Sequence, residues 1–217
     1  RELITLRKLG IDALTQANRR HDELGRDGLA QMPSPNRFGE TALQADIKCE
    51  EDVIKAFEEN NTPIVIISEE HGRLEIGSNP QYLAVLDGID GTKVYKEQFG
   101  EGRYATLLGI FKGTDPTYED ALFSGIMEHA TGKLFYAIKG QGAFVRNLKD
   151  GTTEPLPRID KTSQDNPKWK KLVASTELDQ SLGTPMIGDM VRKLPDDFDI
   201  QGNLWSAVAC YLGLLTG

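Results

Sequence analysis

Two short apolar runs in this chain are each followed by acidic residues whose spacing could hold a divalent cation. The run TPIVIIS (residues 62–68) leads into a pair of glutamates, and the run YLAVL (82–86) leads into Asp87 and then Asp90. Like charges held this close repel one another, and burial increases the penalty. We therefore expect either open water around them or a cation between them. A hard ion such as Mg²⁺ takes carboxylate, carbonyl and water oxygens as ligands.

Both runs are rich in β-branched residues, which predicts buried strands. Two strands that each end in carboxylates predict one acidic cluster at a shared sheet edge, where Glu70 could complete a two-metal site. Two metals about 3.5–4 Å apart can clamp the attacking and leaving oxygens of a phosphoryl transfer. The next residues, Gly91 and Thr92, predict a turn or helix start whose N–H groups would bind a phosphate.

Each motif alone has a structural explanation. Asp, Gly and Thr are turn residues, so D-x-x-D-G-T by itself is typical of a surface turn. A Glu-Glu pair by itself is typical of a solvated strand end. Their occurrence together, at the ends of two buried strands, favours the metal site. His71, beside the glutamates, is predicted to be an exposed loop residue, and Cys49 a small buried hydrophobe.

The remaining pattern supplies the elements that would position these residues, and it argues for an α/β or α+β layered sandwich. We expect an N-terminal α+β half that carries the metal site (1–147) and an incomplete C-terminal α/β half (148–217). The expected helices are 1–24, 43–59, 181–193 and 203–215; beyond the two apolar runs, the expected strands lie in 103–113, 120–147 and 171–176.

Bulk composition narrows the function classes. The chain has 217 residues, 39% hydrophobic and 27% charged, as in a soluble globular protein. No apolar run approaches the roughly 18–20 residues that span a bilayer, so we expect no membrane partner. The net charge of −8, without a basic stretch interleaved with aromatics, argues against a nucleic-acid partner. Two distant cysteines form no disulfide framework, which favours a reducing, cytoplasmic setting.

Several motifs together resemble a known family. SEEHG followed by AVLDGIDGTKVY is similar to the Mg²⁺-dependent, lithium-sensitive phosphomonoesterases of the inositol monophosphatase superfamily, which includes fructose-1,6-bisphosphatases and 3′-phosphoadenosine 5′-phosphate phosphatases. GETALQAD, AIKGQGAFVRN and GNLWSAVACYLGLLTG resemble further motifs of that superfamily, in the right order. The resemblance implies a layered αβαβα sandwich of the sugar-phosphatase type, a homodimer and two or three Mg²⁺ ions.

The resemblance also implies metal ligands. Glu70, Asp87 and the carbonyl of Ile89 would hold a first ion. Asp87 would bridge to a second ion that Asp90 also holds.

Catalytic and substrate roles follow from the same resemblance. Thr92, hydrogen-bonded toward Asp46, would orient and help deprotonate the attacking water, and Glu70 joins these two as a catalytic residue. The backbone N–H groups of Gly91 and Thr92 would hold the ester phosphate. Fixed donors of this kind meet the charge that develops on phosphorus.

Three features depart from the family pattern. Gly88 stands where the family usually has Pro, which removes a fixed φ and should loosen the loop while keeping the carbonyl. Ser68 stands where Gly is usual. The sequence ends at Gly217, before the closing Trp-Asp motif with the last metal ligand. Either the natural chain continues, which we expect, or this protein lacks a full second metal site.

Several functions stay open at this point. Hydrolysis of an inositol monophosphate or fructose 1,6-bisphosphate is the main hypothesis, and Lys93 after D-G-T leaves 3′-phosphoadenosine 5′-phosphate as an alternative substrate. An aspartyl-phosphate phosphatase of the haloacid dehalogenase type is disfavoured, because its two aspartates lie two apart and near the start of the chain. A non-catalytic metal- or phosphate-binding module is the alternative of another class.

Overall fold

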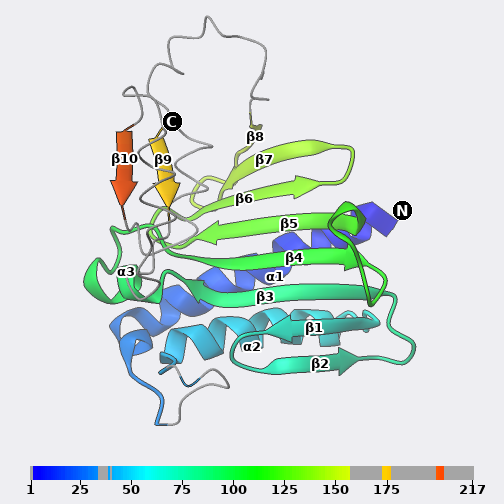
Figure 1. Cartoon of the computed structure of the whole chain (residues 1–217), viewed down its shortest axis with the longest axis horizontal. Coiled ribbons are helices and arrows are strands. Elements are labelled where there is room, and N and C mark those ends of the chain that lie inside the picture. Colours follow the sequence, from blue (N-terminus) through cyan, green and yellow to red (C-terminus); the bar gives the residue numbers. More distant parts are fainter. Residues whose placement is uncertain (1, 34–38, 40, 157–172, 177–198, 203–217) are drawn as a thin grey trace, which may run out of the picture.

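The computed structural model describes residues 2–33, 39, 41–156, 173–176 and 199–202. In this part of the chain, two long helices cover one face of an eight-stranded mixed sheet (Figure 1). The layered α/β architecture expected from the sequence is confirmed. The two remaining strands, β9 (Val173–Thr176) and β10 (Asp199–Gly202), pair in parallel with each other.

Both long helices form where the apolar periodicity predicts them, α1 at Glu2–Leu24 and α2 at Gln44–Glu59. The first turn of α2 is capped from within, because Asp46 Oδ2 accepts the backbone N–H of Leu43 at 2.7 Å. Short helical segments complete the set: η1 (Gly25–Leu29), α3 (Thr92–Glu97) and η2 (Tyr118–Asp120). No helix in the described residues is long and apolar enough to cross a membrane.

The sheet has the order β2-β1-β3-β4-β5-β6-β7-β8. Within it β1 and β3 are parallel, and the other neighbouring pairs are antiparallel. Its strands are β1 (Ile64–Ser68), β2 (Gly72–Ile76), β3 (Tyr82–Asp90), β4 (Ala105–Lys112), β5 (Ala121–Glu128), β6 (Lys133–Ile138), β7 (Gly142–Asn147) and β8 (Thr153–Pro155).

The parallel pair β1–β3 places the two acidic segments side by side. Ser68, the last residue of β1, pairs with Leu86 of β3. The turn that follows β1 therefore lies next to Asp87. The second strand does not end at Leu86 as expected but continues to Asp90, with a register shift against β4 between Asp87 and Asp90.

Other expectations meet the structure as follows. The β-rich segments and the turn after β5 are confirmed, and so is a strand within 171–176. The edge strands β2 and β8 were not expected, because each is short and largely polar. The helices expected at 181–193 and 203–215 lie outside the described residues. The division at residue 147 stays a prediction, although β8 beyond it pairs with β7.

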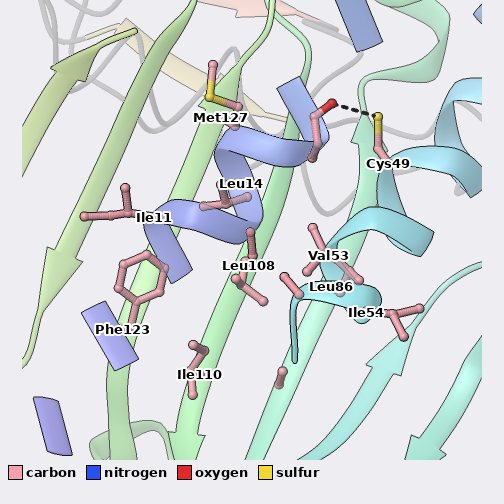
Figure 2. Close-up of a cluster of buried hydrophobic side chains, with 14 of the residues drawn as sticks. Ile11, Leu14, Cys49, Val53, Ile54, Leu86, Leu108, Ile110, Phe123 and Met127 are labelled. Atoms are coloured by element: carbon pink, nitrogen blue, oxygen red, sulfur yellow. Dashed lines mark hydrogen bonds between the residues drawn. The ribbon is translucent and has the colours of Figure 1, made fainter. Parts of the chain in front are cut away.

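The main core lies between the helices and the sheet (Figure 2). Ile11 and Leu14 of α1 meet Leu108 and Phe123 of the sheet, and α2 contributes Val53. Alternation along β4 sends its other face into a smaller cluster around Ala105 and Phe135. The helix α2 packs on β3 and β1, the strands that lead into the acidic segments.

Replacing Leu14 tests this core. Leu14 is fully buried, whereas Ile4 on the same helix is 68% exposed. We expect Leu14→Ala to lower the free energy of unfolding by roughly 2–5 kcal/mol through lost burial and a residual cavity. The matched control Ile4→Ala should change it by less than about 0.5 kcal/mol. Denaturant unfolding followed by circular dichroism measures both, and equal effects would contradict the assigned core.

Candidate active site

A pocket of about 350 Å³ lies where the parallel strands β1 and β3 end and the helices α2 and α3 begin. This volume is within the range of small-molecule sites. Four carboxylates and two lysines give the pocket its character. Its lining consists of Thr41, Ala42, Asp46, Glu69, Glu70, Asp87, Gly88, Thr92, Lys93 and Lys96.

Asp46 reaches the pocket from the first turn of α2, and its side chain is held at both oxygens. Oδ2 accepts the Leu43 N–H, and Oδ1 accepts the Thr92 hydroxyl at 3.3 Å. Burial, together with the nearby charges of Glu70 and Glu69, raises the pKa of Asp46 to about 7 although both hydrogen bonds oppose the rise. Asp46 can therefore exchange a proton near neutral pH.

The pKa of Asp87 is raised further than that of Asp46. Burial raises its pKa to about 8, and the charges of Asp90, Glu69 and Asp46 add to the effect. The strand end thus concentrates negative charge where little water can screen it. The raised pKa of Asp87 agrees with the expectation that like charges repel one another at this strand end.

Glu69, Glu70 and His71 form the turn between β1 and β2, and a buried carboxylate of α2 holds that turn. Glu50, which is fully buried, lies 2.7 Å from His71 Nδ1, and its other oxygen accepts the Glu70 N–H at 3.4 Å. The hydrogen bond to Glu50 raises the pKa of His71. His71 is thus a partly buried, hydrogen-bonded residue, and the expectation of an exposed loop histidine is wrong.

Gly88 sits in a tight contact rather than in a loosened loop. A Cβ at this position would lie 2.1 Å from the backbone carbonyl oxygen of Asp46, so a side chain here would push β3 away from α2. Its own carbonyl accepts the hydroxyl of Thr106 at 2.7 Å. The expected loosening from the missing Pro is therefore not what the structure shows, because packing and a hydrogen bond hold this backbone.

Gly91 turns the chain from β3 into α3. Its φ of 83° lies in the left-handed region, which glycine adopts without a Cβ clash. Thr92 follows as the first residue of α3, and its hydroxyl lies 3.1 Å from the carbonyl of Ile89 as well as near Asp46. One hydroxyl proton is therefore shared between two acceptors.

The pocket gathers part of the expected site. Asp46, Glu70, Asp87 and Thr92 line it, whereas Ile89, Asp90 and Gly91 lie outside its lining. Asp90 still acts on the pocket through its charge, which raises the pKa of Asp87. Among the described residues, no three His, Cys, Asp or Glu side chains converge on one point as the ligands of a bound metal do. The individual roles assigned to these residues stay predictions.

Sequence reasoning missed several residues of this region. Lys96 lines the pocket one helical turn after Lys93, a spacing of three that indicates a shared helix face. Glu50 lies four residues after Asp46 in α2, and the same spacing rule could have singled it out. Thr41 had no signal beyond its place before the helix. Cys49, as expected, is fully buried, and its thiol contacts the carbonyl of Ala17 (Figure 2).

Comparison with known proteins agrees with this arrangement. A solved structure of the extragenic suppressor protein SuhB from Bartonella henselae superimposes with a TM-score of 0.74 at 17% identity, covering 97% of this chain and 74% of that one. An IMPase/NADP phosphatase solved in complex with Mg²⁺ and phosphate gives a TM-score of 0.67 at 19% identity, over 98% and 71% of the two chains. The described fold is therefore that of the sugar-phosphatase class.

The family assignment rests on sequence. The model of the inositol monophosphatase family matches residues 9–197, so the chain belongs to that family. It is 34% identical over 123 residues to the fructose-1,6-bisphosphatase/inositol-1-monophosphatase of Methanothermobacter thermautotrophicus. That match covers 54% of this chain and 44% of the relative, so the chain matches less than half of that protein's length.

The raised pKa values predict how metal-free protein responds to pH. A carboxyl whose pKa rises on folding stabilises the native state below its unfolded pKa of about 4, and this stabilisation is lost as pH rises through the folded value. For Asp46 and Asp87 the window runs from about pH 4 to about 8. In a chelator, we expect the midpoint of thermal unfolding to fall by at least about 3 °C between pH 5 and pH 8.5.

Asp87→Asn is the matched variant, because it keeps the shape of the side chain and removes the charge. Its midpoint should fall less over the same pH interval, and it should exceed that of the unmodified protein at pH 8.5. An identical pH dependence in both proteins would contradict the charge surplus at this strand end.

Proposed function

We propose that this chain hydrolyses a small phosphate monoester with the help of Mg²⁺, using water as the nucleophile. The observation that carries the proposal is the pocket itself: three carboxylates at the ends of two parallel strands and a fourth, Asp46 of α2, to which the Thr92 hydroxyl is hydrogen-bonded. Family membership supports it. Inositol monophosphate or fructose 1,6-bisphosphate is the substrate type that we favour.

The donor set suits magnesium. All candidate ligands are oxygens, as a hard cation requires. Burial and the neighbouring negative charges raise the pKa of Asp87, so a cation bound there would stabilise its charged form. We propose Glu70, Asp87, the Ile89 carbonyl and Asp90 as the residues that would hold two or three ions. Bound there, Mg²⁺ would acidify water and neutralise charge on the phosphate.

The chain's own residues would do the rest. The Thr92 hydroxyl, which is hydrogen-bonded to Asp46, would orient the attacking water, and Asp46 would take up the released proton. The water oxygen would bond to phosphorus as the ester P–O bond breaks, and the departing ester oxygen would take up a proton from solvent to leave as the alcohol, so no covalent enzyme intermediate would form. We propose that the backbone N–H groups of Gly91 and Thr92 hold the phosphate during this exchange.

A second candidate substrate is a bisphosphate of the 3′-phosphoadenosine 5′-phosphate type. The observation that favours it is that Lys93 and Lys96 both line the pocket beside the carboxylates. Two cationic side chains there could contact a second phosphate. We also propose the homodimer and the lithium sensitivity that are usual in the family.

Phosphate release from a panel of esters tests the proposal. Inositol 1-phosphate, fructose 1,6-bisphosphate and 3′-phosphoadenosine 5′-phosphate are each incubated with Mg²⁺, with Mg²⁺ plus lithium, and with chelator. We expect turnover that requires Mg²⁺ and falls with lithium, and the preferred ester identifies the substrate type. Asp87→Asn should lower kcat at least about 100-fold, because it removes a bridging ligand charge.

Two outcomes would contradict this proposal. Turnover that survives chelation or Asp87→Asn would exclude the assigned metal role. Mg²⁺ binding by calorimetry without hydrolysis of any ester would favour a non-catalytic metal-binding module instead.

A further inference from the structure

A chain of buried polar side chains runs from the backbone of the candidate site to helix α1. Thr106 of β4, His129 after β5 and Asn18 of α1 are each less than a tenth exposed. Thr106 donates its hydroxyl proton to the Gly88 carbonyl at 2.7 Å, and its oxygen lies 2.9 Å from His129 Nε2. His129 Nδ1 lies 3.0 Å from the side-chain oxygen Oδ1 of Asn18.

The chain begins at an irregularity in the sheet. The two residues between Asp87 and Asp90 face the single residue Thr106 on β4, which is a β-bulge. A bulge interrupts the ladder of backbone hydrogen bonds and redirects the side chains beside it. Here the side chain of Thr106 supplies the hydrogen bond to the bulged backbone. The bulge therefore has a partner that can fix its geometry.

The direction of the hydrogen bonds follows from the groups involved. A carbonyl only accepts, so the Thr106 hydroxyl donates to the Gly88 carbonyl. The oxygen of the Asn18 amide faces His129 Nδ1, while its nitrogen donates to Asp22 at 3.1 Å. In a neutral ring Nδ1 is therefore the donor, and Nε2 is a second acceptor beside the Thr106 hydroxyl.

His129 is held as a neutral ring. Burial and the neighbouring His21 keep the pKa of His129 well below its usual value. The two rings stack with centroids 4.4 Å apart and planes 16° from parallel. The neutral ring can therefore donate to Asn18 through Nδ1 without placing a charge in the core.

Burying these polar groups costs more than an apolar core at the same place would, because each leaves water. The desolvation cost is offset only if every buried polar group has a hydrogen-bond partner. The last partner in this series is the Gly88 carbonyl, next to Asp87. On the opposite side, the missing Cβ of Gly88 lets the Asp46 backbone approach closely. The bulged backbone at Gly88 is thus held by the Thr106 hydroxyl on one side and by close packing against the Asp46 backbone on the other.

We propose that Thr106, supported by His129 and Asn18, is a positioning residue for the candidate active site. By fixing the Gly88 carbonyl it sets the direction in which Asp87 and Asp90 leave the strand. This inference rests on the proposed function, since Asp87 and Asp90 are the proposed metal ligands.

The first experiment compares Thr106→Val with Thr106→Ser in the full chain. Valine has the shape of threonine without the hydroxyl, and serine keeps the hydroxyl without the methyl group. For Thr106→Val we expect kcat to fall about tenfold, the effect of one lost hydrogen bond, with KM for the ester changed by less than about twofold. The Mg²⁺ concentration for half-maximal rate should rise at least about threefold. Thr106→Ser should restore most of both values.

The second measurement does not depend on activity. Hydrogen–deuterium exchange should be faster in residues 87–92 of Thr106→Val than in the unmodified protein and Thr106→Ser, with the rest of the sheet unchanged. Faster exchange throughout the sheet, or equal exchange in residues 87–92, would overturn the positioning role. An unchanged Mg²⁺ requirement and kcat in Thr106→Val would also overturn it.

The failure of the two proposals can be told apart. If the unmodified protein hydrolyses no ester, the proposed function fails, and the exchange data alone decide whether Thr106 orders the bulge. If hydrolysis is present but both Thr106 variants behave as the unmodified protein does, only the positioning inference fails.

Discussion

The parallel pairing of β1 with β3 is the constraint on which the rest of the site depends. Within the described eight-stranded sheet the other neighbouring strands are antiparallel. Because β1 and β3 are parallel, these two apolar strands end at the same end of the sheet. Glu69 and Glu70 then lie beside Asp87 because Ser68 pairs with Leu86. An antiparallel arrangement would have placed the two acidic segments at opposite ends of the sheet. The antiparallel strand β2 returns the chain to the start of β1, so that β3 begins level with β1 and runs parallel to it.

The pairing of β1 with β3 brings several negatively charged side chains close together. Burial and like charges raise the pKa values of Asp46 and Asp87 to about 7 and 8. The Leu43 N–H donates to Asp46, and Glu50 of α2 accepts the Glu70 N–H, although the charge of Glu50 adds to the rise in the pKa of Asp87. Such a surplus of one charge, arranged around a pocket, is typical of a place that receives a cation.

The elements around the site, α2 and β4, contact its backbone closely at Gly88. Gly88 has no Cβ, so α2 and β3 approach until a methyl group would collide with the Asp46 carbonyl. On the other side Thr106 binds the same glycine, and behind Thr106 lie His129 and Asn18 of the core. The bulge between Asp87 and Asp90 thus connects the polar pocket to the packing of α1. A small change in the core can alter the geometry of the acidic residues by this route.

The sequence by itself determined the elements and the type of chemistry, because both depend on local patterns. Apolar periodicity gave α1 and α2, β-branched runs gave β1 and β3, and the placement of Asp87 and Asp90 after such a run indicated an oxygen-ligand site. Only the tertiary structure decided which residues meet. It pairs the partly buried His71 with Glu50 and packs Gly88 against the Asp46 backbone. It also forms the series of contacts from Thr106 through His129 to Asn18. Asn18 and His129 are 111 residues apart in the chain, and no local pattern encodes a contact over that distance. Strand order and close packing create such pairs, and a sequence shows neither until the chain is folded.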